Sequence, residues 1–252
     1  MTEDAITTGA APTGTVAEQT PVGRRRLVPA PTRTQLVVLI VALLYLAGSV
    51  GYVLGSRPVA DPSRNSVDVG FLYDMIAHHE QAVALASIEL GKGGDNDVSV
   101  YAREILTTQA YEMGLMQQQL ANWGYAREDP RGTAMAWMEM PVAPEAMPGL
   151  ASEAEIDILT EAQGADADAL FIALMQDHHR GGVHMGEYAA SNAKWDFVRD
   201  VAAGMVRSQR IEIDELDQAR VRDGLSADPP GYEPAQVPSS APTRQLPSRL
   251  PA

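Results

Sequence analysis

One nine-residue pattern occurs twice in this chain, and this duplication limits the possible folds more than any other feature. Residues 71–79 read Phe-Leu-Tyr-Asp-Met-Ile-Ala-His-His, and residues 171–179 read Phe-Ile-Ala-Leu-Met-Gln-Asp-His-His. A second pattern, Gln-x-x-Glu, recurs at the same offset in Gln109, Glu112, Gln209 and Glu212. Two unrelated amphipathic helices would share apolar positions but not these polar spacings. The sequence therefore predicts two copies of one helical unit.

The region 67–225 has the residue spacing of amphipathic helices. Apolar residues recur every three or four positions in four long stretches, which indicates one buried face per helix. The link from Arg127 to Leu150 contains four prolines and cannot be a regular helix. Ser152-Glu-Ala-Glu155 fits a capping box that opens a short helix. Because no stretch alternates with period two, we predict an all-α protein in which two duplicated hairpins form a four-helix bundle.

A charge-free apolar run occupies residues 35–54. As a helix it would cross a hydrocarbon core of roughly 30 Å. Arginines are more numerous before this run than directly after it, which favours a cytoplasmic N-terminus and an extracytoplasmic main domain. A cleaved signal peptide is the alternative, but its apolar region is usually only about 7–15 residues long. The sequence favours an uncleaved transmembrane helix and a cell-membrane location.

These features divide the chain into five segments. We expect a disordered cytoplasmic tail over residues 1–34, the transmembrane helix over 35–54, a tether over 55–66, the bundle over 67–225, and a disordered proline-rich tail over 226–252. The net charge of -14 argues against nucleic acid as a partner, because phosphate binding needs clustered Lys and Arg. The absence of cysteine excludes disulfides and thiolate metal sites.

All five histidines lie in or just after the two repeated motifs, and each His-His pair follows a methionine by three residues. On a helix such residues are neighbours. Imidazole and thioether ligands suit copper(I), so copper is the expected metal ahead of iron or zinc. The alternative is ordinary packing by methionine and hydrogen bonding by histidine. The predicted ligands are Met75, His78, His79, Met116, Met175, His178, His179, His184 and Met185.

Other polar residues of the repeats have supporting roles in this interpretation. Gln109, Glu112, Gln209 and Glu212 are expected to orient the imidazoles, although Arg103, Arg207 and Arg210 could pair with the carboxylates instead. Asp68 and Asp168 are expected to act as N-terminal helix charges. The link between the repeats also contains a cluster of methionines, which we expect to pack in the core rather than bind a metal. These are Met135, Met138, Met140 and Met147.

The pattern Asp-x-x-Phe-x-x-x-Met-x-x-His-His, followed by Gln-x-x-Glu and Met on the next helix, resembles the bacterial family known as domain of unknown function 305. The link Met147-Pro-Gly-Leu-Ala-Ser-Glu-Ala-Glu resembles it too, and the likeness covers about residues 67–220. It implies a ferritin-like bundle, exported or membrane-anchored, with copper binding in some members. The family often has Met seven residues after the first His of each pair. Leu85 stands there in the first repeat and Met185 in the second, so we expect the second repeat to dominate metal affinity.

Together these features predict a membrane-anchored, extracytoplasmic protein that buffers, sequesters or transfers copper(I), with a protein partner in metal transfer or in a membrane complex. No activated Ser or Cys nucleophile and no phosphate-binding loop points to an enzyme. Two alternatives remain open at this stage: a structural or assembly factor of a membrane complex that binds no metal, and a metal-dependent oxidoreductase.

Overall fold

The computed structural model describes residues 30–55, 60–94, 96–127 and 132–238. Most of the expected cytoplasmic tail (1–29) and the end of the expected C-terminal tail (239–252) lie outside the described residues. The chain divides into two units, Met1–Val59 and Ala60–Ala252.

The first unit contains one helix, α1 (Arg33–Gly55). Thr32 and Gln35 cap its start, since the Gln35 N–H donates to the Thr32 hydroxyl at 3.3 Å. The stretch Arg33–Val53 is long and apolar enough to cross a membrane, and none of it is buried within the protein. A core helix of a soluble protein would cover such a surface, so α1 has the character of a membrane span or signal anchor.

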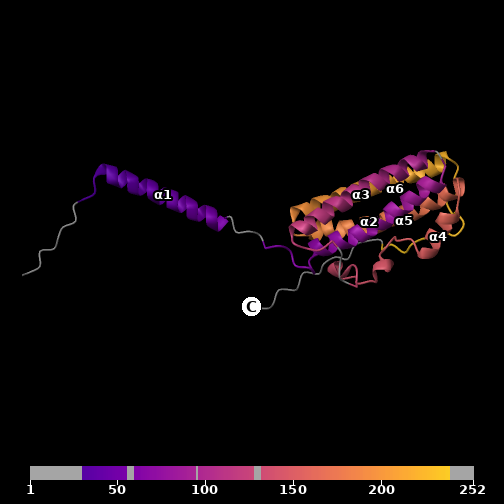
Figure 1. Ribbon diagram of the computed structural model, residues 1–252, viewed down its shortest axis with the longest axis horizontal. Helices are drawn as coiled ribbons and strands as arrows, with labels where there is room; N and C mark the ends of the chain where they lie inside the picture. Colours follow the sequence, from indigo (N-terminus) through magenta and orange to yellow (C-terminus); the bar gives the residue numbers. More distant parts are fainter. Residues whose placement is uncertain (1–29, 56–59, 95, 128–131, 239–252) are drawn as a thin grey trace, which may run out of the picture. The chain divides into compact units, whose positions relative to one another are not determined.

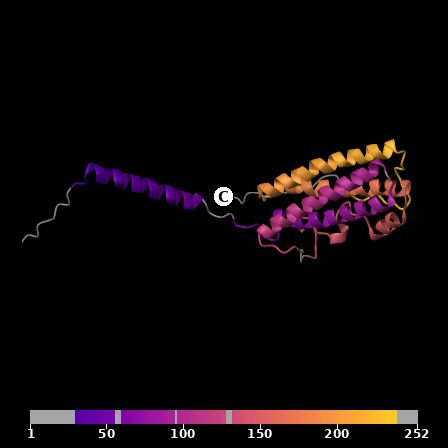
Figure 2. The same ribbon diagram turned by 45° about the horizontal axis from the view of Figure 1, so that its top comes forward.

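The second unit is built from four long helices, α2 (Val67–Lys92), α3 (Asp97–Asn122), α5 (Ala165–Asn192) and α6 (Asp196–Arg222). Figures 1 and 2 show α2 with α3 and α5 with α6 as two hairpins that pack together. The short helices η1 (Ala136–Met138), η2 (Pro144–Ala146) and α4 (Glu153–Glu161) lie between the two hairpins along the chain. The described ranges contain no β-strand, only the isolated bridge between Ala134 and Val142. The predicted all-α, ferritin-like bundle is confirmed.

Local signals in the sequence explain where these helices begin. The Ser66 hydroxyl caps α2, and the Asn96 side chain caps α3. Ser152 and Glu155 form the predicted capping box at the start of α4. Each cap satisfies backbone N–H groups that have no partner within the helix.

Asp68 and Asp168 do more than place a charge at a helix start. Asp68 Oδ1 accepts hydrogen bonds from the backbone N–H groups of Lys194 and Trp195, at 3.0 and 2.8 Å. Asp168 accepts from the Gly94 N–H at 2.8 Å and from the Asn96 amide at 2.6 Å. Each aspartate thus holds the turn of the opposite hairpin. The start of α2 lies next to the end of α5, and the start of α5 lies next to the end of α2. The two helices therefore run antiparallel.

The segment after α6 differs from the expected disordered tail. The Tyr232 hydroxyl and the Ala235 N–H both donate to Asp177 Oδ2, each at 2.7 Å. The Glu233 N–H donates to Glu155 Oε1 at 3.2 Å. Carboxylates on α4 and α5 supply these acceptors, and a count of prolines in the tail cannot reveal them. Of the expected tail, residues 232–235 therefore lie on the bundle.

Candidate metal centre

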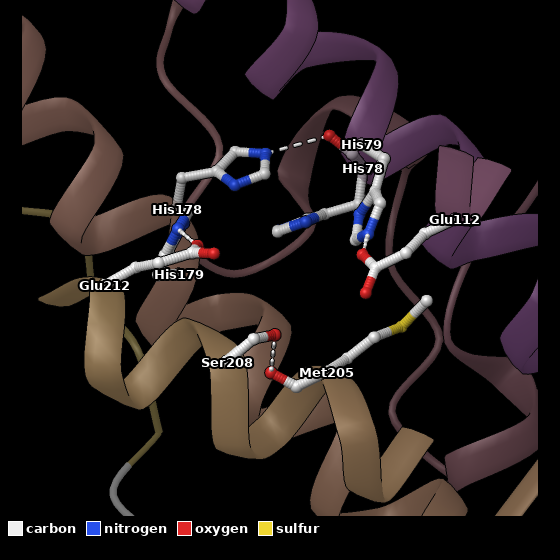
Figure 3. Close-up of polar contacts among 8 residues, drawn as sticks. All are labelled: His78, His79, Glu112, His178, His179, Met205, Ser208 and Glu212. Atoms are coloured by element: carbon white, nitrogen blue, oxygen red, sulfur yellow. Dashed lines mark hydrogen bonds and ion pairs between the residues drawn. The ribbon is translucent and has the colours of Figure 1, made fainter. Parts of the chain in front are cut away.

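Four histidines meet at the middle of the bundle, where α2 and α5 pass each other. His78, His79, His178 and His179 are fully buried. The ring centroids of His78 and His178 lie 3.8 Å apart, and those of His178 and His179 lie 6.1 Å apart. Figure 3 shows the four rings gathered between the two helices. We call these four side chains the histidine layer.

Each ring of the histidine layer contacts an oxygen through its Nε2 atom. His79 Nε2 lies 2.9 Å from Glu112 Oε2, and His179 Nε2 contacts Glu212 Oε2 in the same way (Figure 3). His178 Nε2 lies 2.8 Å from the backbone oxygen of His78. The fourth contact, from His78 Nε2 to the Pro148 oxygen, is 3.2 Å long.

These contacts decide which ring nitrogen holds the proton. A carbonyl or carboxylate oxygen accepts, so Nε2–H must donate in each pair. A neutral imidazole then carries a lone pair on Nδ1. The four Nδ1 atoms of the histidine layer are buried and have no hydrogen-bond partner among the described residues. Histidines that bind metals commonly donate their other ring N–H to a carboxylate or carbonyl in this manner.

Electrostatics keep the two central rings neutral. Burial is the main cause that lowers the pKa of His78 to about 3, and the neighbouring His79 lowers it further. Burial and His78 lower the pKa of His178 well below its ordinary value. Both rings therefore keep their lone pairs far into the acid range, which is the form that can bind a metal.

The residues expected to orient the imidazoles behave in two ways. Glu112 and Glu212 contact His79 and His179, as described above. The amides of Gln109 and Gln209 are buried and have no hydrogen-bond partner within the part of the chain that the structure describes. A Cβ atom at Gly182 would lie 2.2 Å from Gln209 Oε1, so the glycine leaves room for this amide in its present position.

The methionines are distributed unevenly about the histidine layer. One core cluster contains most of them: Met75, Met116, Met135, Met138, Met147, Met185 and Met205. Met175 belongs to the other core cluster, together with Leu85, Ile105 and Leu216. We call the first group the methionine pole. It joins the first repeat's Met75 to the second repeat's Met185, whereas Met175 stands apart from both.

The expectation that the second repeat dominates metal affinity stays a prediction, but the packing does not group the thioethers by repeat. Met175 and Met185 are on one helix, but ten residues separate them along α5. Because α2 and α5 are antiparallel, Met185 comes to the end of the bundle that holds Met75. The thioethers of the two repeats are thus shared between the repeats rather than sorted by repeat.

His184 is not brought into the histidine layer. It lines a separate surface cavity of about 340 Å³ with Arg180, Arg210 and Val237. Both of its ring nitrogens are buried without a partner among the described residues. Arg210 pairs with Glu187 rather than with the carboxylates next to the histidines.

Two contacts of the site could not be read from the sequence. Pro148, from the link, supplies the oxygen that faces His78. Asp74 Oδ2 accepts from the Met135 N–H and from Trp137 Nε1, both at 2.6 Å, and so holds the methionine-rich link against α2. Asp74 gives no repeat signal, because Leu174 stands at the matching position.

The site contains possible metal ligands, but they are not arranged as a preformed coordination shell. Within the described ranges, no three His, Asp or Glu side chains are already placed to hold a metal ion. The donors that fit a metal are the four orphaned Nδ1 atoms and the thioethers of the methionine pole. This combination of nitrogen and sulfur suits a soft ion with few ligands.

The family model described as domain of unknown function (DUF305) matches residues 68–220. The chain belongs to this family. A DUF305 protein from Streptomyces coelicolor is 32% identical, and the match covers 68% of this chain and 100% of that chain with a TM-score of 0.60. A DUF305 fragment from Deinococcus radiodurans is 30% identical, with 66% and 99% covered and a TM-score of 0.54.

A weaker likeness is to CopM in the Cu(I)-bound form, which is 26% identical with 62% of this chain and 96% of that chain covered. Its TM-score of 0.47 is too low to support any conclusion about this DUF305 chain. No curated protein matches the sequence.

Proposed function

We propose that the bundle binds copper(I) through the histidine layer and through Met75 and Met185 of the methionine pole, and that it buffers the metal or passes it to a partner. The observation that carries this proposal is the set of four buried Nδ1 lone pairs with no hydrogen-bond donor. A buried acceptor without a partner costs about 1–3 kcal/mol. Four such groups at one place are better explained as ligands than as packing.

The neighbouring side chains determine which ion would be preferred. Met75 and Met185 lie in the methionine pole at one end of the bundle, while Glu112 and Glu212 are engaged by histidines. A hard ion such as manganese would need more free oxygen ligands than this site supplies. A bound copper ion would act as a Lewis acid that accepts lone pairs from the ring nitrogens and thioethers. Glu112 and Glu212 would fix the ring orientations through the Nε2–H bonds.

The proposed location rests on α1. This helix would anchor the chain in the cell membrane, with the arginine-rich segment before it on the cytoplasmic side. The bundle would then bind copper outside the cytoplasm. A protein partner for transfer is part of the same proposal, because a buffering protein must release its metal to another ligand.

Copper(I) titration of the full chain in detergent, in competition with a chromophoric chelator, tests this function. We expect His79→Ala and His179→Ala each to lower copper(I) affinity by at least about 10-fold, because removing a ligand costs no less than removing the partner that orients it. His184→Ala is the matched control and should leave the affinity within about twofold, since His184 lines a different cavity. Equal losses in all three variants, or tighter binding of zinc than of copper(I), would contradict the proposal.

A further inference from the structure

A cavity of about 510 Å³ lies between α2 and the link that joins the repeats. Tyr73, Ala77 and Glu80 line it from α2. Residues at this spacing share one helix face. His78 and His79 project from other faces of α2 into the core, so the helix itself separates the cavity from the histidine layer. A side chain from another element must connect the two.

Met147 makes this connection. It lines the cavity, yet only 4% of its surface is exposed, and it belongs to the methionine pole with Met75. The next residue, Pro148, supplies the oxygen that faces His78 Nε2 at 3.2 Å. Met147 thus lines the cavity and shares a core cluster with Met75, and the residue after it contacts the histidine layer. Of the described residues that line the cavity, it alone carries sulfur.

The walls of the cavity suit a cation that arrives from solution. Among the described lining residues, Asp74 and Glu80 contribute carboxylates, and Arg127 contributes a guanidinium. The two hydrogen bonds from the Met135 N–H and Trp137 Nε1 hold Asp74 in place. Carboxylates attract a cation but bind copper(I) poorly, whereas a thioether binds it well. A soft ion in this cavity would therefore transfer to Met147.

We propose that this cavity is the loading site for copper(I) and that Met147 is its relay ligand. The proposal rests on the function proposed above. A copper(I) ion exchanges its donor ligand for the Met147 thioether, and then exchanges Met147 for Met75 and the histidine Nδ1 atoms. Only coordination bonds form and break, and the metal stays in the same oxidation state throughout.

Stopped-flow loading of the full chain in detergent from the copper(I)–bicinchoninate complex tests this route. Met147→Leu keeps the shape of the side chain but has no lone pair. We expect it to slow loading at least tenfold while equilibrium affinity changes less than twofold. Ala77→Phe should slow loading by narrowing the cavity with Met147 intact. Met140→Leu and Ala84→Phe are the matched controls, because neither residue lines the cavity, and both should load at the wild-type rate.

Three results separate the possible failures. Loading of Met147→Leu and Ala77→Phe at the wild-type rate would overturn the route. An equal loss of rate and affinity in Met147→Leu would make Met147 a resident ligand and would also overturn it. If the wild-type chain takes up no copper(I) at equilibrium, the proposed function is contradicted, and the proposal that Met147 is a relay ligand is contradicted as well.

Discussion

At the scale of single residues, burial sets the chemistry of the histidine layer. The sequence located His78 and His178 on apolar helix faces and suggested that they bind a metal. It could not show which ring nitrogen is free, because this depends on the Pro148 oxygen for His78 and on the backbone oxygen of His78 for His178, and both lie far away along the chain. The repeated Gln-x-x-Glu pattern did reveal that Glu112 and Glu212 act with the histidines.

The lowered pKa values of His78 and His178 predict how the stability of the metal-free protein changes with pH. Below about pH 6.5 the unfolded chain binds protons at these histidines, while the folded chain does so only near pH 3 for His78. The contribution of these two histidines to stability is therefore fully present above pH 6.5 and is lost as pH falls, by up to about 1.4 kcal/mol per pH unit for each histidine. Urea unfolding at pH 7 and pH 5 measures this loss.

The single variant His78→Gln provides the control for this measurement. It removes one titrating group, so stability should fall less between pH 7 and pH 5 in this variant than in the wild type, by up to about 1.4 kcal/mol per pH unit below pH 6.5. If wild type and variant show the same pH dependence, the buried histidines do not control it.

At the scale of helices, sequence periodicity predicted the number and type of elements but not how the hairpins face each other. A spacing of three or four residues identifies the buried face of a helix and says nothing of which end of another helix it meets. For that reason the partnership of Met75 with Met185 was missed, and Met175 was grouped with Met185. The antiparallel crossing depends on the two clamps made by Asp68 and Asp168.

The clamp of Asp68 gives a test at this scale. Asp68→Ala would leave the backbone N–H groups of Lys194 and Trp195 without their acceptor, and we expect it to lower the free energy of unfolding by about 1–3 kcal/mol. Asp166→Ala is the control, because Asp166 also lies in the first turn of a helix but is exposed. Thermal or urea unfolding compares the two variants.

Equal effects from Asp68→Ala and Asp166→Ala would mean that Asp68 acts only as a helix charge. Changing Asp68 is a simpler test than changing Asp168, because Asp168 interacts with the buried carboxyl group of Glu89. Burial, followed by the Asp168 carboxylate, raises the pKa of Glu89 to about 9. A change at Asp168 would alter that titration as well as the clamp.

At the scale of the whole molecule, the duplication has produced one shared centre with unlike ends. The histidine layer uses equivalent residues from both repeats, whereas seven thioethers gather at one end and Met175 belongs to the other core cluster. Three pairs of equivalent positions differ between the repeats and account for the unequal ends. In each pair one repeat has Met and the other has Leu or Ile: Met116 and Leu216, Leu85 and Met185, and Ile105 and Met205. The sequence contains each of these differences, but only the packing of the hairpins places the methionines together.

The most direct test of this account is X-ray absorption spectroscopy at the copper edge of the copper(I)-loaded full chain. We predict both nitrogen and sulfur ligands in the wild type. The sulfur signal should disappear in the double variant Met75→Leu/Met185→Leu, which removes both proposed thioether ligands, and persist in Met175→Leu, because Met175 belongs to the other core cluster. Loss of the sulfur signal in Met175→Leu, or a wild-type spectrum without sulfur, would contradict a copper site shared between the histidine layer and the methionine pole.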